Sequence, residues 1–362
     1  MVLSIVAVVV LEGLASVGLL TGDIAAIRRP PVANFRQSAY DSLVGWVSFP
    51  NLAIRDDFGP GLALTTNADG LRIHRPVARA LAPGERRIMC SGASFTFGSG
   101  VADGDTFCAR LEQELPGVRT LNVAQLGYGV DQSFLWYRRD GARWPSQVHL
   151  FIVNGSDLDR TASKDLTGYA KPVLAVDHDT LVARNVPVPR WTGWSRWDQA
   201  KGLVPDLRIA QVVANRVDLS ETAQYRRVDA KVWPMMDVLL RDLARLDRER
   251  HAAPVLVYLP GEPEFAPGPR DERRRHIARS AAAAGIPVVD LTADLRAVAP
   301  DSLDWMYITP NALPVRGSGG HFTPTGHRWV AQRLAEHLRA LPSTAAALAL
   351  PPAAAPAAIA SR

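Results

Sequence analysis

Short apolar runs alternate with longer amphipathic stretches along most of the chain. The apolar runs have the length and composition of buried strands, and they cover residues 87–90, 120–124, 148–153, 254–260 and 286–291. The amphipathic stretches carry apolar residues at helical spacing, and they cover residues 105–115, 130–144, 231–250, 271–284 and 324–341. This alternation is typical of a parallel sheet with helices on both faces. It predicts an α/β fold, a three-layer sandwich around a central parallel five-stranded sheet, within residues 87–341.

Three segments break the alternation and define the expected domain boundaries. Residues 30–86 contain turn signals such as NADG, and we expect them to form a leader packed on the core. Residues 160–230 form an insertion whose Trp191, Trp194 and Trp197 fit either a small local core or a sugar-stacking platform. Residues 342–362 are rich in Ala and Pro and have no periodic face, which predicts a disordered tail.

Residues 1–22 are almost entirely apolar and are interrupted only by Glu12 and small residues. A stretch of about one bilayer thickness predicts a membrane anchor or signal segment. A buried core helix is the alternative. Arg28 and Arg29 follow the stretch, and by the positive-inside rule they favour a cytoplasmic position for the domain behind them. The orientation of such an anchor therefore stays open.

Composition and charge exclude several function classes. The chain has 41 Lys and Arg against 36 Asp and Glu, and the two signs are interspersed, so we expect a solvated surface and no nucleic-acid partner. Asp157 and Asp159 have no further ligands at metal-binding spacing, so we expect no metal and no other cofactor. Cys90 in a strand and Cys108 in a helix are too few for a disulfide framework, and we expect them to be unpaired, with a bridge between them as the alternative.

Groups that could perform chemistry follow the predicted strands in order. Ser94 follows the first strand, Gly127 the second, and Asn154 and Ser156 the third, while His321 precedes the last helix. The carboxyl ends of parallel strands meet at one edge of a sheet, where binding groups gather. Ser94 is the candidate nucleophile and His321 the base that takes its proton; the alternative is an ordinary loop serine. The backbone N–H groups of Ser94 and Gly127, with a side chain of the NGSD segment, are candidate oxyanion donors.

These residues lie in blocks that resemble the SGNH (GDSL-like) hydrolase family over most of residues 87–341. The matching blocks are Gly92–Ala93–Ser94 for the nucleophile, Gly127 in LNVAQLGYGVDQ, Ser156 in NGSD, and His321 followed by TPTGH. The leader also resembles that of membrane-anchored bacterial members. The resemblance implies a flavodoxin-like sheet and a hydrolase that acts on esters with a serine and a histidine.

The blocks are degenerate at three positions. Ala93 stands where the family has an aspartate, and Ser156 stands where it has the asparagine of the oxyanion hole, although Asn154 lies two residues earlier. The family's carboxylate just before His321 is replaced by residues 318–319, a Ser–Gly pair. The resemblance therefore implies a Ser–His dyad without a nearby aspartate, with a backbone carbonyl as one alternative for holding the histidine.

Three functions fit these residues. The first is a serine ester hydrolase that removes acyl groups such as acetate from a carbohydrate or other polar ester through Ser94 and His321. The second is an O-acyltransferase that moves an acyl group to a polysaccharide with the same residues. The third is a non-catalytic relative that binds a polysaccharide or a partner protein at the altered site. We expect the chain to be anchored in the membrane by residues 1–22 and to face the periplasm or the cell exterior.

Overall fold

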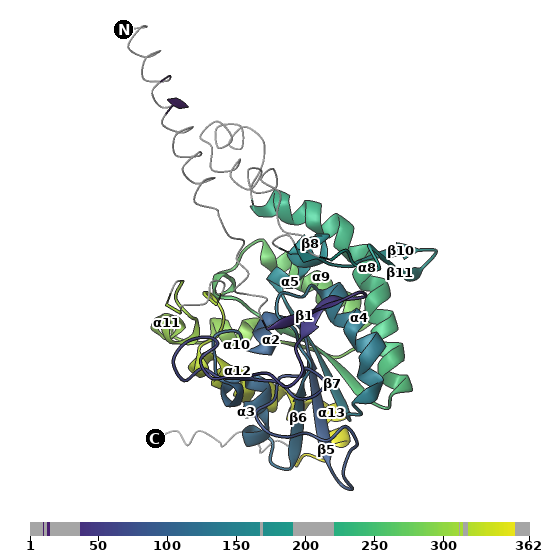
Figure 1. Cartoon of the computed structure of the whole chain (residues 1–362), viewed down its shortest axis with the longest axis vertical. Coiled ribbons are helices and arrows are strands. Elements are labelled where there is room, and N and C mark those ends of the chain that lie inside the picture. Colours follow the sequence, from purple (N-terminus) through teal and green to yellow (C-terminus); the bar gives the residue numbers. More distant parts are fainter. Residues whose placement is uncertain are drawn as a thin grey trace, which may run out of the picture.

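The computed structural model describes residues 37–166, 169–190, 221–310, 312–313 and 318–351, together with residues 10, 13 and 14. Its centre is a parallel sheet with the strand order β13-β12-β7-β5-β6 (Figure 1). The strands are β5 (Arg86–Ser91), β6 (Val118–Asn122), β7 (Val148–Asn154), β12 (Ala253–Leu259) and β13 (Val288–Asp290). The five strands coincide with the predicted apolar runs. The predicted α/β fold with a central parallel five-stranded sheet is therefore confirmed.

Helices cover both faces of this sheet because neighbouring residues of a strand point to opposite sides. On β7, Leu150 belongs to one apolar core and Phe151 to the other. The first face carries α3 (Phe107–Glu114), α12 (Pro324–Ala340) and α13 (Pro342–Leu348). The second face carries α4 (Val130–Asp140), α8 (Glu221–Glu249) and α9 (Arg270–Ala283). Burial on both sides explains why the sequence of β7 is almost wholly apolar.

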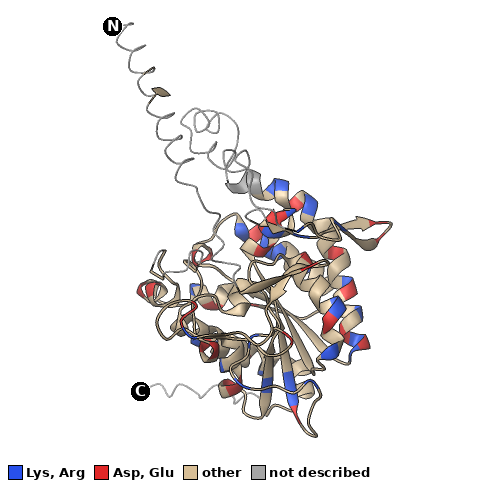
Figure 2. Ribbon diagram, in the orientation of Figure 1, with Lys and Arg blue, Asp and Glu red and all other residues tan. Residues whose placement is uncertain are grey.

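Shorter elements connect the sheet to these helices. They are α2 (Ser94–Phe97), α5 (Gly155–Thr161), α10 (Thr292–Arg296), α11 (Leu303–Met306) and the 3₁₀ turns η2 (Asp103–Asp105), η3 (Gly141–Arg143), η5 (Glu262–Glu264) and η6 (Pro300–Ser302). Basic and acidic side chains are interspersed along the outer helices, most visibly on α8 (Figure 2). There Arg245 pairs with Glu249 at 2.9 Å, one turn along the helix. Exposed pairs of this kind keep the surface solvated and contribute little to the free energy of folding.

The leader packs over the loop that follows β6. Its two antiparallel pairs are β1 (Ser38–Asp41) with β2 (Gly45–Ser48), and β3 (Ala53–Ile54) with β4 (Leu64–Thr65). Trp46 donates its indole N–H to the Leu126 carbonyl at 2.8 Å, and its ring meets Tyr128 edge-on with centroids 5.7 Å apart. The leader is thereby fixed beside Gly127, at the edge of the sheet where the candidate residues lie.

The start of the insertion forms two further antiparallel pairs. These are β8 (Asp165–Leu166) with β9 (Tyr169–Ala170), and β10 (Val173–Asp177) with β11 (Thr180–Arg184). The predicted cluster of Trp191, Trp194 and Trp197 lies outside the described residues, as does nearly all of the predicted anchor at 1–22. Within the described part of the chain, no helix combines the length and the apolar character needed to cross a bilayer.

The prediction of disorder from residue 342 onward was wrong for its first part. Residues Pro342–Leu348 form α13, which packs beside α12 on the first face of the sheet. Thr344 and Leu348 are 0% and 3% exposed, so these two side chains anchor an otherwise alanine-rich turn. Pro342 lies in the first turn of the helix, where its missing N–H costs no hydrogen bond. Composition alone conceals such an anchor, and residues 352–362 lie outside the described residues.

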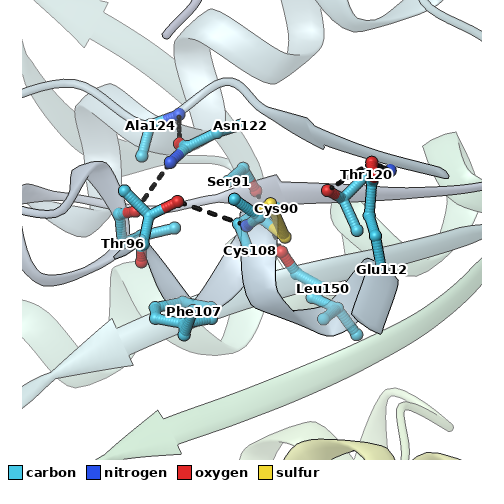
Figure 3. The surroundings of a disulfide bond; sticks show 12 residues. Cys90, Ser91, Thr96, Phe107, Cys108, Glu112, Thr120, Asn122, Ala124 and Leu150 are labelled. Atoms are coloured by element: carbon cyan, nitrogen blue, oxygen red, sulfur yellow. Dashed lines mark hydrogen bonds between the residues drawn. A yellow bond between two sulfur atoms is a disulfide. The ribbon is translucent and has the colours of Figure 1, made fainter. Parts of the chain in front are cut away.

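The prediction of two unpaired cysteines was also wrong. Cys90 of β5 and Cys108 in the first turn of α3 form a disulfide, and their Cα atoms are 6.5 Å apart (Figure 3). Both side chains belong to the apolar core on the face that α3 covers. The sequence shows which elements carry the cysteines. It does not show how the helix is positioned against the strand, and this position decides whether the two cysteines are close enough to pair. The disulfide ties the strand that leads to Ser94 to its neighbouring helix.

We expect the disulfide to stabilise the fold chiefly by restricting the unfolded chain. Its cysteines are 18 residues apart, and closing a loop of that length contributes about 3 kcal/mol. Urea unfolding with and without reductant should therefore give free energies that differ by roughly this amount. The Cys90→Ala/Cys108→Ala variant is the control, and its unfolding should not respond to reductant. Equal unfolding free energies for the oxidised and reduced protein would contradict the expectation.

Candidate active site

Ser94 stands at the first position of the one-turn helix α2, directly beyond the end of β5. The close approach of β7 requires the glycine that precedes it. A Cβ added at Gly92 would lie 3.0 Å from the Ile152 carbonyl oxygen and 2.5 Å from Thr96 Oγ1. Only a residue without a side chain fits there, so the chain can turn sharply and present Ser94 at the carboxyl edge of the sheet.

A buried arginine from the leader holds the turn that carries Ser94. Arg72 donates from Nη1 to the carbonyls of Phe97 and Gly98 at 2.7 and 2.6 Å. Its Nε pairs with Asp103 at 2.8 Å. These bonds satisfy carbonyls at the end of α2 that have no partner further along so short a helix. The leader therefore contributes directly to the geometry of the nucleophile turn.

The structure brings Ser94 and His321 together. His321 Nε2 lies 2.8 Å from Ser94 Oγ, although the two residues are 227 positions apart in the sequence. The segment before α12 is held by the bridge between Tyr307 and Phe322 and by the bond from Ile308 N to the His321 carbonyl at 2.7 Å. His327, the other histidine of this region, instead accepts a hydrogen bond from Phe107 N at 3.1 Å in the core.

A backbone carbonyl, not a carboxylate, orients the imidazole of His321. Its Nδ1 lies 3.1 Å from the Ser318 carbonyl oxygen. A carbonyl can only accept, so Nδ1 carries the proton and Nε2 has its lone pair free for the Ser94 hydroxyl. The ring of Phe95 packs against the imidazole with centroids 4.5 Å apart and fixes its plane. The tautomer needed for proton abstraction is thus set without an aspartate.

Burial keeps this histidine neutral. Burial chiefly, and then the positive charge of Arg160, lower the pKa of His321 to about 4, while hydrogen bonds to backbone oxygens act in the opposite direction. At neutral pH the imidazole is therefore a free base. The same surroundings make the imidazolium costly, because among the described residues Nδ1 faces a neutral carbonyl and no anion that would offset the charge that proton transfer creates.

A cavity of about 430 Å³ opens beside the dyad. Its wall is formed mainly by α5, η5, the N-terminus of α9 and the His321 loop, and the residues include Phe95, Asn154, Ser156, Asp159, Arg160, Tyr225, Glu262, Glu264, Arg270 and His321. Two of the predicted oxyanion residues, Asn154 and Ser156, are thus placed with the base. Gly127 does not line this cavity. Its φ of +72° is a left-handed backbone conformation, which accounts for the glycine without a role in catalysis.

Asn154 ends β7 and caps the start of α5. Its Oδ1 accepts from Ser156 N at 3.0 Å and from Ser156 Oγ at 2.9 Å, and its Nδ2 donates to the Leu259 carbonyl at 2.8 Å. An amide nitrogen has two hydrogens, so one N–H of Asn154 remains for a ligand. Asn154 is therefore the better side-chain candidate for an oxyanion donor, since the hydroxyl hydrogen of Ser156 is already engaged.

A second serine–histidine pair, this one with a carboxylate, lies inside the sandwich. Ser91 Oγ is 2.6 Å from His149 Nε2, and His149 Nδ1 is 2.9 Å from Asp247 Oδ1. The Tyr137 hydroxyl donates to the same carboxylate oxygen. This array is not predicted from the sequence, although Ser91 and His149 are the polar residues of strands that are otherwise apolar at their centres. Its geometry is that of a Ser–His–Asp triad.

Access to a substrate distinguishes the two arrays. The side chains of His149 and Asp247 are 0% exposed, and the array lies between the sheet and α8. None of its residues lines the cavity, whereas His321 does, and Phe95 beside Ser94 does as well. A buried Ser–His–Asp network is fully satisfied by its own hydrogen bonds and fixes α8 on the sheet. We therefore assign Ser91, His149 and Asp247 to the core and Ser94 and His321 to the candidate active site.

Within the ranges that the structure describes, no three or more His, Cys, Asp or Glu side chains gather as metal ligands would. The absence of a metal and of any other cofactor stays a prediction.

Comparisons with known proteins give distant likenesses in fold. No protein-family profile and no curated protein matches the chain. A lipase/acylhydrolase from Enterococcus faecalis is 12% identical, with a TM-score of 0.37 over 70% of this chain and 95% of that one. A member of the lipolytic protein G-D-S-L family from Veillonella parvula is 13% identical, with a TM-score of 0.38 over 68% and 95% of the chains. An α/β hydrolase from the metagenome of Lake Arreo is 11% identical, with a TM-score of 0.38 over 75% and 97%.

The difference in access between the two serines predicts selective labelling. A fluorophosphonate should modify Ser94, because His321 takes its proton beside an open cavity, and it should leave Ser91 unmodified. Peptide mapping by mass spectrometry locates the adduct. Ser94→Ala should abolish labelling, and Ser91→Ala is the matched control that should retain it. An adduct on Ser91 would overturn the assignment of the two arrays.

The buried, neutral state of His321 predicts how this labelling depends on pH. The base form exists above its pKa of about 4, so the labelling rate should be flat near neutrality and should fall only as the pH drops through about 4. Circular dichroism at each pH verifies that the fold is intact. A midpoint near 6.5, the value of a solvated histidine, would show that the imidazole is not held as described.

Proposed function

We propose that this protein is a serine esterase of the SGNH type, which hydrolyses acyl esters with Ser94 as nucleophile and His321 as base. The observation that carries the proposal is the 2.8 Å contact between Ser94 Oγ and His321 Nε2, beside a cavity at the carboxyl edge of the sheet. That edge, next to the strands β5 and β7 where the order reverses, is where open α/β sheets bind their ligands. The SGNH-like sequence blocks around both residues also support the proposal.

The proposed reaction has two steps. Ser94 Oγ attacks the ester carbonyl carbon while its proton passes to His321 Nε2; the bond to the alcohol then breaks, and the alcohol leaves with that proton. Water next attacks the acyl-serine while His321 takes one of its protons, and the carboxylic acid leaves as the proton returns to Ser94 Oγ. The free N–H of Asn154 and the backbone N–H group of Ser94 are the proposed donors to the oxyanion.

The missing carboxylate sets an expectation for the rate. The Ser318 carbonyl keeps the imidazole in the productive tautomer, but it carries only a partial charge and stabilises the imidazolium less than an aspartate does. Stabilisation of the transition state must then come mainly from the oxyanion donors and from bound substrate. We therefore propose a slow esterase whose activity depends on a substrate that fits the cavity.

The cavity wall supports a polar ester as the substrate. Most of the side chains that line it are polar or charged, among them Asn154, Ser156, Asp159 and Glu262, so an acylated carbohydrate suits it better than a lipid. The cavity is also open to solvent, and water reaching the acyl-serine favours hydrolysis over transfer to another alcohol. We accordingly place hydrolysis ahead of O-acyl transfer.

The disulfide between Cys90 and Cys108 supports a location outside the cytoplasm. Disulfides persist in oxidising compartments and are rare where thiols are kept reduced. We propose that the domain faces the periplasm or the cell exterior and that residues 1–22 anchor it to the membrane. The anchor rests on the apolar sequence of that segment alone.

The proposal predicts that the full-length protein hydrolyses p-nitrophenyl acetate through Ser94. Ser94→Ala and His321→Ala should each lower kcat/KM by about 10³-fold or more, because nucleophile and base act as a unit. Initial rates of p-nitrophenol release measure the effect. Ser91→Ala should keep most of the activity per folded molecule.

Three outcomes of this experiment are informative. Full activity of Ser94→Ala would exclude the proposed nucleophile. Transfer of acetate to an added oligosaccharide, faster than its release to water, would replace the hydrolase with the acyltransferase. A protein that binds an acylated glycan but shows neither turnover nor labelling of Ser94 would be the non-catalytic relative.

A further inference from the structure

Arg160 stands in the last turn of α5 and lines the same cavity as His321. Its Nη1 donates to Asp157 Oδ1 at 2.7 Å and to the Tyr128 carbonyl at 3.4 Å. Nε and Nη2, which together carry three further N–H groups, have no acceptor among the described residues. The side chain is 21% exposed and lines the cavity, and its bond to Asp157 holds the guanidinium in place.

The partners of Arg160 explain its fixed position. Asp157 is buried, and its second carboxylate oxygen accepts from Asn154 N at 2.9 Å, at the start of the same helix. Burial raises the pKa of Asp157 to about 6, while the charge of Arg160 and its hydrogen bond lower it. One face of the guanidinium is thereby anchored to the helix that also carries Asn154, and the opposite edge is left for a ligand.

The other charged groups of the cavity wall carry both signs. Asp159 pairs with Arg273 at 3.0 Å. Glu264 is buried, accepts from the Tyr258 hydroxyl and from Gly261 N, and has its pKa raised by burial. Arg270 lines the cavity as a second cation, and Glu262 faces it from η5. Asp159 thus has a cationic partner of its own and Glu264 is held by its own hydrogen bonds, so neither carboxylate occupies the free edge of Arg160.

The charge of Arg160 disfavours the protonated form of the general base, and its ion pair with Asp157 offsets only part of that charge. Arg160 opposes protonation of His321, and the protonated imidazole is the species formed when Ser94 attacks. The Ser318 carbonyl on the far side of the ring cannot offset a full charge. An anion placed on the free edge of Arg160 would remove this opposition. A negatively charged substrate therefore favours protonation of His321, and with it the attack of Ser94, more than a neutral substrate does.

We propose that Arg160 is the specificity-determining residue of this site and that its free Nε–Nη2 edge binds an anionic group, a carboxylate or a phosphate, carried by the ester substrate. The inference rests on the proposed esterase function and names the class of ester. Planar guanidinium groups bind such oxyanions through two parallel hydrogen bonds, which fix orientation as well as affinity. Bound in this way, the substrate holds its ester near Ser94 and neutralises the charge that opposes His321.

A matched pair of esters tests the proposal on the full-length chain. 4-Acetoxybenzoate and its methyl ester release the same acetate and differ in one negative charge, and 4-acetoxyphenyl phosphate supplies the phosphate arm. We expect kcat/KM for at least one anionic ester to exceed that for the neutral ester by roughly 10- to 100-fold, the range of a charged hydrogen-bonded pair. Comparison of the two anionic esters shows whether a carboxylate or a phosphate is preferred.

Variants of Arg160 separate recognition from structure. Arg160→Gln should abolish the preference for the anion, and Arg160→Lys should keep part of it, because lysine retains the charge but not the fork. For the neutral ester, Arg160→Gln should keep or raise kcat and move the acid limb of kcat/KM to higher pH, since the pKa of His321 is released from the nearby cation. Arg226 is an exposed arginine of α8, and Arg226→Gln is the control. It should change neither the preference for the anionic ester nor the pH of the acid limb.

Two further measurements keep the test decisive. The double variant Asp157→Asn/Arg160→Gln removes both members of the ion pair. It replaces Arg160→Gln if the unpaired, buried carboxylate of Asp157 disturbs folding. Calorimetry with Ser94→Ala, which cannot turn over, should show binding of 4-acetoxybenzoate that is lost when Arg160→Gln is added. Equal rates for charged and neutral esters, unchanged by Arg160→Gln, would overturn the role of Arg160 while the esterase stands. Failure to cleave any of the esters, with no labelling of Ser94, would overturn the esterase itself.

Discussion

The hydrogen bond between Ser94 and His321 is the interaction on which the account depends. It joins two residues 227 positions apart at 2.8 Å, so it exists only if several distant segments are placed correctly. Gly92 lets the chain turn beneath β7, Arg72 of the leader holds the end of α2, and the Ser318 carbonyl fixes the imidazole. Much of the fold therefore serves to bring one hydroxyl to one lone pair.

The protein shows that a complete triad and an accessible site are separate properties. Ser91, His149 and Asp247 have the better set of side chains, but they are enclosed between the sheet and α8, where they satisfy one another. Ser94 and His321 lack a carboxylate but stand beside an open cavity. Chemistry on a bound molecule needs access first, and the missing charge can be supplied by the substrate. Arg160, at the wall of the same cavity, is placed to select a substrate that does so.

The sequence predicts the framework better than the details of the site. Five apolar runs and their flanking helices follow from periodicity, and Ser94 and His321 follow from their places after strands and before the last helix. The Ser318 carbonyl could not be predicted, because a backbone group has no signature in the sequence. The Cys90–Cys108 disulfide and the Ser91–His149–Asp247 array depend on how helices are set against strands. Arg160 follows the NGSD segment in the sequence, but the sequence does not show that its Nη1 bonds to Asp157 and leaves Nε and Nη2 without an acceptor among the described residues.

The most direct measurement of the central claim is a crystal structure of the protein after reaction with a phosphonate ester that mimics the tetrahedral stage of ester hydrolysis. The account predicts phosphorus bonded to Ser94 Oγ, with His321 Nε2 within hydrogen-bond reach of the adduct and Nδ1 still donating to the Ser318 carbonyl. It also predicts that a phosphonate oxygen faces the side-chain amide of Asn154. Phosphorus bonded to any other residue, or a His321 ring turned away from the adduct, would contradict the account.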